Sequence, residues 1–373
     1  MDRPEILLGA GLIGGLGRVF DNIFGRGEAA VTVPPLDGAL RPNRVLDETA
    51  LRFPLADVDS LVVLGGQLIA VAGNIIYAFD HGGSWQRRSD HEAEIVALAT
   101  IGDDGLAIAL ATGEIVVQGG RFGGRRYGAS EKLGCITELT IFGNELFVAN
   151  GSATNGALNW QRDLLERNAS GSIWRIHLES GASTRIAAAL AWPAGLSVER
   201  DVIVFSESWK HRLVRIELAN PGRMEAVNTD LPGYPGRFAL AGDGYWLALF
   251  APRSQLVEFV LREPGYRKRM MAEVPEPFWV SPKLRSGCSF YESLQGGGVK
   301  HLGMLKPWAP TMSAGLLVRL DRAFQPRSSL QSRADGRTHG VTAAVEHHGQ
   351  VFVAARGGDV VVSLRVADLG AAG

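Results

Sequence analysis

The sequence predicts an all-β protein, a six-bladed β-propeller with a short N-terminal helical extension. Three observations lead to this prediction: a strand-like phrase that recurs six times, a high glycine content, and the lack of helical periodicity between the copies. Glycine accounts for 47 of 373 residues, roughly 13% against a usual value of about 7%. Propeller blades need tight turns between short strands and small residues near a crowded axis, which explains this excess.

The recurring phrase begins with a Gly or Asp turn and continues with strand-type residues. Its copies begin at residues 66, 105, 143, 201, 244 and 349, so the spacings are 39, 38, 58, 43 and 105 residues. A second strand-like run follows each copy, for example NIIYAFD at 74–80 and LVEFVL at 256–261. Three or four short strands per unit of about 40 residues are typical of a propeller blade. An alternating α/β fold would need helices between the strands, and only residues 158–167 have a helical pattern.

The ends of the chain and one internal segment do not fit the repeat. Residues 1–50 form a predicted extension, a helix followed by a Pro-rich linker, ahead of the propeller at 51–366, and residues 367–373 form a tail. Residues 264–311 form a long predicted excursion between blades, with six prolines and several aromatic residues. Long loops in compact domains are usually functional or disordered, and the aromatic residues favour a lid or a substrate wall.

The apolar stretch at residues 6–20 is too short for a membrane span of about 20 residues. The segment before it is charge-balanced and lacks the net positive charge of a signal peptide. We therefore expect a helix packed on the body of a cytoplasmic protein. Weak membrane association through residues 6–20, or export, is the alternative.

Charge and cysteine content argue against several classes of function. Lys and Arg number 38 and Asp and Glu number 39, a net charge of −1, so a chain without basic runs is a poor candidate for nucleic-acid binding. The two cysteines, Cys135 and Cys288, are too few for a disulfide framework and form no CxxC zinc motif. The GxSxG, HExxH and GxxxxGK(S/T) motifs are absent from the sequence.

Five motifs follow one another in a characteristic order: SGSIWRI at 170–176, LAWPAGLS at 190–197, ESWKHRLVRI at 207–216, LPGYP at 231–235 and VTAAVEHHGQVF at 341–352. With these motifs the chain resembles the strictosidine synthase-like family of six-bladed propellers, which is related to the gluconolactonase/regucalcin and paraoxonase lactonases. The resemblance covers roughly residues 55–366 and is strongest in the middle third.

The resemblance implies a metal site at the centre of the ring. In the lactonase relatives a divalent ion, usually Ca²⁺, lies in the central tunnel and is bound by oxygen ligands from several blades, as a hard cation prefers. It implies Asp59, or Asp57 if the alignment shifts by two residues, and Glu138 as metal ligands here. Two further ligand positions correspond to Ala194 and Gly236, which carry no side-chain oxygen, and Arg237 replaces another. One divalent cation stays a candidate cofactor, but a normal calcium site is not expected.

The resemblance also places polar residues at the tunnel mouth. His339 is the candidate general base, Asp59 would place water or a metal, and Arg237 would bind a carboxylate or stabilise an oxyanion. The predicted substrate-binding residues are Glu94, Thr137, Thr342 and Trp192. Structural alternatives remain open: a turn or cap for the carboxylates, a core hydrogen bond for the histidine, and a blade-to-blade salt bridge for Arg237.

We therefore expect a hydrolase that cleaves a lactone or ester of a small organic molecule in the central tunnel. A propeller that binds a small molecule or acts as a scaffold without catalysis is the alternative, and the residues at 194 and 236 favour it. A condensation of the strictosidine synthase type is disfavoured, because residues 337–342 (RTHGVT) lack the acid that the resemblance places before the last blade.

Overall fold

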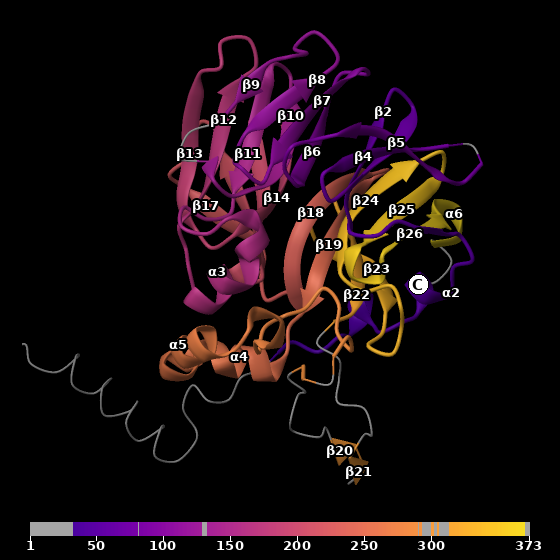
Figure 1. Ribbon diagram of the computed structural model, residues 1–373, viewed down its shortest axis with the longest axis vertical. Helices are drawn as coiled ribbons and strands as arrows, with labels where there is room; N and C mark the ends of the chain where they lie inside the picture. Colours follow the sequence, from indigo (N-terminus) through magenta and orange to yellow (C-terminus); the bar gives the residue numbers. More distant parts are fainter. Residues whose placement is uncertain are drawn as a thin grey trace, which may run out of the picture.

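Six four-stranded antiparallel sheets form a ring in the computed structural model (Figure 1). The structure describes residues 33–80, 82–128, 133–289, 291–292, 300–301, 304–305 and 313–369. The innermost strand of each sheet contacts the innermost strand of the next sheet all the way around the ring. The chain is therefore a six-bladed β-propeller, and the fold predicted from the sequence is confirmed.

Blades I to IV are built from consecutive strands. Blade I contains β2 (Val58–Leu64), β3 (Gln67–Ala72), β4 (Ile75–Phe79) and β5 (Trp85–Asp90). Blade II contains β6 (Ile95–Ile101), β7 (Gly105–Leu110), β8 (Ile115–Gln118) and β9 (Arg126–Tyr127). Blade III contains β10 (Ile136–Phe142), β11 (Glu145–Asn150), β12 (Gly171–His177) and β13 (Ser183–Leu190). Blade IV contains β14 (Pro193–Glu199), β15 (Val202–Glu207), β16 (Arg212–Glu217) and β17 (Met224–Asn228).

Blades V and VI join strands that are distant in the sequence. Blade V contains β18 (Gly233–Ala241), β19 (Gly244–Pro252), β22 (Gly315–Asp321) and β23 (Pro326–Ser332). Blade VI contains β24 (Val341–His347), β25 (Gln350–Ala355), β26 (Val360–Arg365) and, as its outer strand, β1 (Arg52–Pro54). β1 pairs with β26 in the register Arg52↔Val362 to Pro54↔Val360. The ring is thus closed by a strand from the other end of the chain, which the sequence repeat did not predict.

The recurring sequence phrase is the second strand of every blade. Residues in β3, β7, β11, β15 and β25 are buried on both faces, because each blade is covered by a neighbour on either side. A strand that is buried on both faces appears in the sequence as a continuous apolar run rather than as an alternating one. Phe147 of blade III and Phe205 of blade IV, for example, share one core cluster and are at most 1% exposed.

The insertion departs from the prediction in two ways. It leaves blade V after β19 and returns at β22, so it lies within a blade and not between blades; β19 and β22 pair directly. The expected strand at 256–261 is part of helix α4 (Gln255–Arg262), which packs against α5 (Pro264–Glu273). The Ser254 side chain accepts a hydrogen bond from the Val257 N–H and caps α4. Short apolar runs of β-branched residues fit either element, and this cap favours the helix.

Few other helices are present in the described residues. The predicted helix at 158–167 is confirmed as η3 (Ala157–Asn159) and α3 (Trp160–Glu166), and α3 lies beside α5 on one side of the molecule (Figure 1). Short elements elsewhere are η1 (Gly38–Leu40), α2 (Val45–Glu48), η4 (Ser208–Lys210), η5 (Glu276–Phe278), η6 (Arg356–Gly358), α6 (Val366–Leu369) and the two-stranded hairpin of β20 (Lys300–His301) and β21 (Met304–Leu305).

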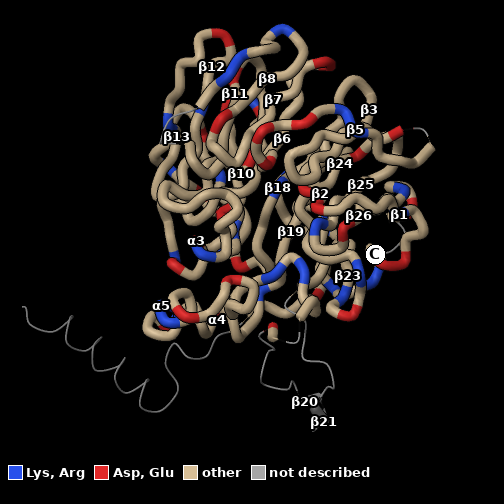
Figure 2. Tube along the Cα trace, in the orientation of Figure 1, with Lys and Arg blue, Asp and Glu red and all other residues tan. Residues whose placement is uncertain are grey.

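The apolar stretch at residues 6–20 lies outside the described residues, so its predicted helix is not tested. Among the helices that are described, none has the length and apolar character needed to cross a membrane. Basic and acidic residues are interspersed along the blades (Figure 2). The expected absence of nucleic-acid partners remains a prediction.

Candidate functional site

The inner strands share an irregularity near the axis of the ring. In five blades the pairing of the first two strands shifts at one residue: Asp59, Val96, Thr137, Ala194 and Thr342. A β-bulge leaves one residue out of the ladder and changes the direction of its side chain. The same irregularity in each of these blades therefore brings residues from distant parts of the chain to one place.

These bulged residues line a cavity at one end of the axis. The cavity is open to solvent and has a volume of about 110 Å³, smaller than the roughly 300–1,000 Å³ that is usual for drug-sized ligands, so it suits a small or partly exposed molecule. Its polar lining comes from Asp59, Thr137, Arg237, Thr342 and Arg356. Its apolar lining comes from Val96, Ile136, Ala157, Leu158, Trp160, Trp192, Ala194, Gly236, Phe250 and Leu284. The cavity thus combines an apolar wall with a charged floor.

Aromatic side chains stiffen the wall. Trp192 stacks on Trp209 with ring centroids 5.0 Å apart, and Trp160 meets Phe250 edge-on at 5.5 Å. The Trp209 indole N–H donates to the buried Asp163 carboxylate at 2.8 Å. Trp192 also has a φ of +56°, which is unusual for a bulky residue and is held in place by these contacts. The wall therefore presents flat, fixed apolar surfaces to the cavity.

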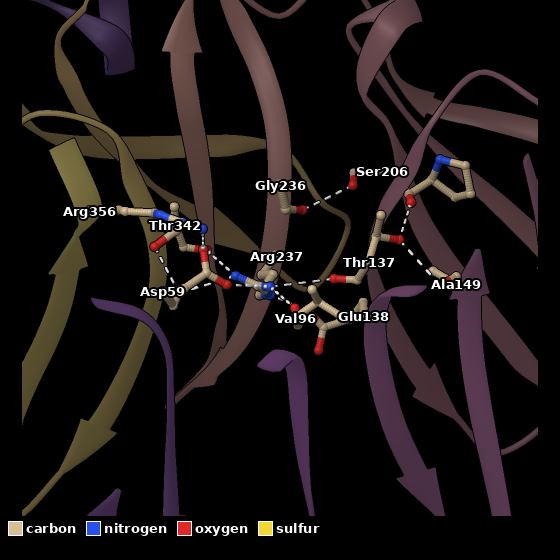
Figure 3. A network of polar contacts seen from close by, with 11 residues as sticks. Asp59, Val96, Thr137, Glu138, Ala149, Ser206, Gly236, Arg237, Thr342 and Arg356 are labelled. Atoms are coloured by element: carbon tan, nitrogen blue, oxygen red, sulfur yellow. Dashed lines mark hydrogen bonds and ion pairs between the residues drawn. The ribbon is translucent and has the colours of Figure 1, made fainter. Parts of the chain in front are cut away.

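Arg237 lies at the centre of the ring. Besides its bulge near Tyr234, β18 has a second register shift between Pro235 and Phe238, and this shift contains Gly236 and Arg237. Figure 3 shows the Arg237 side chain between Asp59 on one side and Thr137 and Glu138 on the other. Its Nη2 lies 2.8 Å from Asp59 Oδ2, and its Nε lies 2.8 Å from Glu138 Oε2. Of the roles considered for Arg237 from the sequence, the structure therefore shows the salt bridge between blades.

Backbone oxygens complete the surroundings of the guanidinium. Arg237 Nη1 donates to the carbonyls of Asp59 (3.1 Å) and Thr342 (3.4 Å), and Nη2 donates to those of Val96 (2.6 Å) and Thr137 (3.5 Å). The Nε contact with Glu138 is a close ion pair without hydrogen-bond alignment. The hydrogen bonds of Arg237 thus come from its two Nη groups, which carry four of its five N–H donors. Arg237 forms part of the floor of the cavity with both Nη groups already engaged.

The buried carboxylates differ in their protonation. Burial by itself would raise the pKa of Asp59, but Arg237 and Arg356 together hold that pKa below its usual value. Burial raises the pKa of Glu138 to about 7, although Arg237 acts in the opposite direction. Asp59 contacts two guanidinium groups and Glu138 only one, which explains the difference.

Arg356 also lines the cavity, although no sequence motif predicted it. It begins η6, directly after β25, and its guanidinium contacts Asp59 Oδ1 at 3.4 Å and Glu94 Oε1 at 2.9 Å. Its side chain is 26% exposed, more than that of Arg237 at 15%. A signal was present in the sequence, because Phe250, the last residue of one copy of the recurring phrase, and Arg356, the first residue after another copy, both line the cavity.

The structure brings most of the predicted site residues together. Asp59, Arg237, Thr137, Thr342 and Trp192 line the cavity. The predicted substrate-binding Glu94 reaches it only through its ion pair with Arg356, and the predicted ligand Glu138 contacts Arg237. The Thr342 hydroxyl donates to the Asp59 carbonyl and the Thr137 hydroxyl donates to the Pro193 carbonyl, so both join neighbouring blades.

His339 lies apart from this group. Its Nδ1 is 2.9 Å from Ser313 Oγ and its Nε2 is 2.9 Å from the Arg333 carbonyl, and the cavity lining does not include it. Burial lowers the pKa of His339, so the ring is neutral near pH 7. The structure therefore does not place the expected general base beside Asp59 and Arg237.

The residues at the axis do not fit a bound divalent ion. Both predicted ligands, Asp59 and Glu138, contact the Arg237 guanidinium, which fills the space between them. Ala194 and Gly236 lie beside the same cavity and offer no side-chain oxygen. In the described part of the chain, no group of three or more His, Cys, Asp or Glu side chains is arranged to hold a metal.

Comparison with known proteins supports the fold, but it identifies no relative by sequence. No family model matches the sequence, and no curated protein sequence matches it significantly. Regucalcin from Agrobacterium tumefaciens, described as a calcium-binding protein, is 14% identical with a TM-score of 0.51, over 87% of this chain and 93% of its own. This likeness supports the six-bladed fold, and the resemblance seen in the sequence is confirmed at that level.

Two further solved structures are similar at a lower score. A putative gluconolactonase is 9% identical with a TM-score of 0.49, over 87% of this chain and 91% of its own. Virginiamycin B lyase from Staphylococcus aureus is 12% identical with a TM-score of 0.46, over 84% of this chain and 98% of its own. These values carry no conclusion about activity.

Proposed function

We propose that this chain binds a small organic molecule in the cavity at the propeller axis. The molecule has a flat apolar part that packs against Trp160 and Trp192, and a carbonyl or carboxylate oxygen that accepts hydrogen bonds from Arg356. The observation that carries the proposal is the cavity itself, which places an aromatic wall beside a charged floor. Apolar surfaces with a few fixed polar groups are characteristic of small-molecule sites.

Arg356, rather than Arg237, is the group suited to contact the ligand. The contacts of Arg356 with Asp59 and Glu94 engage two of its five N–H groups. Its pKa is raised: burial acts against the charge, but Asp59 and Glu94 outweigh it, so the guanidinium is positive. An arginine in this state binds carboxylate or carbonyl oxygens through charge-assisted hydrogen bonds.

Hydrolysis of a lactone or ester is the second candidate, favoured by the presence of Asp59 and Arg356 in one cavity. Asp59 would take a proton from water, the water oxygen would attack the carbonyl carbon, and Arg356 would stabilise the oxyanion. The C–O bond would then break and the alkoxide would regain the proton from Asp59, leaving an acid and an alcohol. The lowered pKa of Asp59 makes it a weak base, and binding alone therefore stands first.

Binding is tested by tryptophan fluorescence and thermal shift with phenylacetate, indole-3-acetate and the aromatic lactone dihydrocoumarin. We expect at least one probe to quench the fluorescence and raise Tm. Arg356→Gln should weaken that binding about tenfold or more, as the loss of a charge-assisted hydrogen bond requires. Arg322→Gln, on the outer surface, should bind like the wild type. The proposal fails if no probe binds or if Arg356→Gln binds as tightly as the wild type.

The same probes separate binding from hydrolysis. Turnover of dihydrocoumarin is followed by the release of its ring-opened acid. Hydrolysis by the proposed route requires that Asp59→Asn lose this activity while it still binds phenylacetate. Binding of the lactone without release of the acid would leave the non-catalytic function standing.

A further inference from the structure

We propose that Arg237 is a built-in cation of the propeller axis: its guanidinium joins and neutralises the inner ends of the blades, so that the ring needs no metal ion. It follows that replacing Arg237 by a small neutral residue creates a binding site for a divalent cation. This inference concerns the stability of the ring and is independent of the proposed function.

The guanidinium is surrounded by oxygen atoms from four other blades. The carbonyl oxygens come from Asp59 of blade I, Val96 of blade II, Thr137 of blade III and Thr342 of blade VI, at 2.6–3.5 Å from the guanidinium nitrogens. The side chains of Asp59 and Glu138 add two carboxylate oxygens at 2.8 Å. Arg237 itself comes from blade V, so one side chain connects five of the six blades.

The charge of Arg237 is needed where it lies. The side chains of Asp59 and Glu138 are only 12% and 11% exposed, and two carboxylates so poorly hydrated need a cation between them. Burial disfavours the charge of Arg237, but Asp59 and Glu138 together raise its pKa, so the guanidinium stays positive. Removal of the side chain would leave two carboxylates and four carbonyls facing one space. Such an all-oxygen set is what a hard divalent cation prefers.

The backbone fixes Arg237 in this position. The second register shift of β18 puts Gly236 and Arg237 outside the ladder, and blade IV approaches at that point through Gly195. A Cβ on Gly195 would lie 2.2 Å from the Gly236 carbonyl oxygen and 2.9 Å from Arg237 Cα. Because the main chain is packed this closely, the fixed position of the Arg237 backbone, and not only its flexible side chain, places the guanidinium at the axis.

The test compares the wild type with Arg237→Ala and with Arg237→Lys, the control that keeps a positive charge. Ca²⁺ binding is measured by calorimetry at pH 8, and Tm is measured with EDTA and with 5 mM CaCl₂. The wild type should bind no Ca²⁺ and melt at the same temperature in both. Arg237→Ala should melt lower in EDTA, regain part of the loss in CaCl₂ and bind about one ion per chain, the stoichiometry of one such oxygen cage. Arg237→Lys should show no Ca²⁺ response.

The Ca²⁺-binding and Tm results each support or overturn the proposed role of Arg237. Stoichiometric Ca²⁺ on the wild type, or a lower Tm of the wild type in EDTA, overturns the proposal. The proposal is also overturned if Arg237→Ala folds and its Tm changes neither with CaCl₂ nor with 20 mM guanidinium chloride. The guanidinium ion is included because it is the chemical group that the substitution removes. If Arg237→Ala folds only when Ca²⁺ or guanidinium is present, the proposal is supported. If it folds under no condition, Arg237→Lys decides: it should fold and ignore Ca²⁺, and a Lys variant that binds one ion overturns the proposal.

Discussion

Glu138 provides a quantitative check on the charges at the axis. Three carboxylates, Asp59, Glu94 and Glu138, face two guanidinium groups, Arg237 and Arg356. The cluster therefore carries one negative charge in excess when all five groups are ionised. Burial raises the pKa of Glu138 to about 7, so this is the carboxyl that takes up the proton. The perturbation that tests this is Glu138→Gln, which keeps the shape and removes the titration.

The sign of the effect follows from proton binding. Below its unfolded-state pKa near 4.5, Glu138 is protonated in both states, and between 4.5 and about 7 only the folded state holds the proton. The contribution of Glu138 to the stability of the wild type therefore falls as the pH rises through this window. At about 1.4 kcal/mol per pH unit, the interval corresponds to about 3 kcal/mol. Glutamine cannot lose a proton, so Glu138→Gln should gain about 3 kcal/mol relative to the wild type between pH 4.5 and pH 8.

Urea denaturation at several pH values between 4.5 and 8 measures this difference. Any pH dependence that comes from groups other than Glu138 is shared by both proteins and cancels in the comparison. Glu217→Gln is the matched control, because that side chain is 59% exposed and pairs with Arg215 at the surface. Its stability curve should run parallel to that of the wild type. If the curve of Glu138→Gln also runs parallel to that of the wild type, Glu138 stays ionised throughout beside Arg237 and the prediction is wrong.

Two further predictions concern packing and the histidine. Gly195→Ala should lower the free energy of unfolding by about 3 kcal/mol, because the new Cβ would lie 2.2 Å from the Gly236 carbonyl oxygen, a backbone atom that side-chain repacking cannot move away. Gly134→Ala, where a Cβ has nothing within 4 Å, should be nearly neutral, and equal denaturation midpoints for the two would contradict the packing argument. His339→Ala should cost about 1–3 kcal/mol through the loss of its contacts with Ser313 and Arg333, and leave probe binding unchanged. A variant that melts like the wild type but no longer binds or turns over the probes would return His339 to the site.

The elements of the fold were largely predictable from the sequence. Strands that are buried on both faces leave a local signature, a short apolar run after a turn, and six copies of it specify six blades. Helix α3 was also predictable from its own residues. The run at 256–261 was assigned wrongly as a strand, because its β-branched residues favour a strand while the Ser254 cap and the packing of Val257 and Val260 favour a helix.

The candidate site was predictable only in part. Asp59, Thr137, Thr342, Trp192 and Arg237 were expected near the axis, and all of them line the cavity. Three further lining residues were missed, because no motif marked them. Trp160 begins α3, in the segment between β11 and β12, Phe250 lies near the end of β19, and Arg356 begins η6.

The local sequence therefore encodes the repeat of strand, turn and strand, with the composition of a propeller. It does not encode the contacts of Arg237 with Asp59, Val96, Thr137 and Thr342, which lie 178, 141, 100 and 105 residues away from it in the chain and are brought together by the folded ring. The closure of the ring by β1 and the bulges at the axis were decided in the same way. The physical reason is that periodicity and turn chemistry act between neighbours in the chain, whereas the partner of a buried charge is set by how six separate blades converge on one axis.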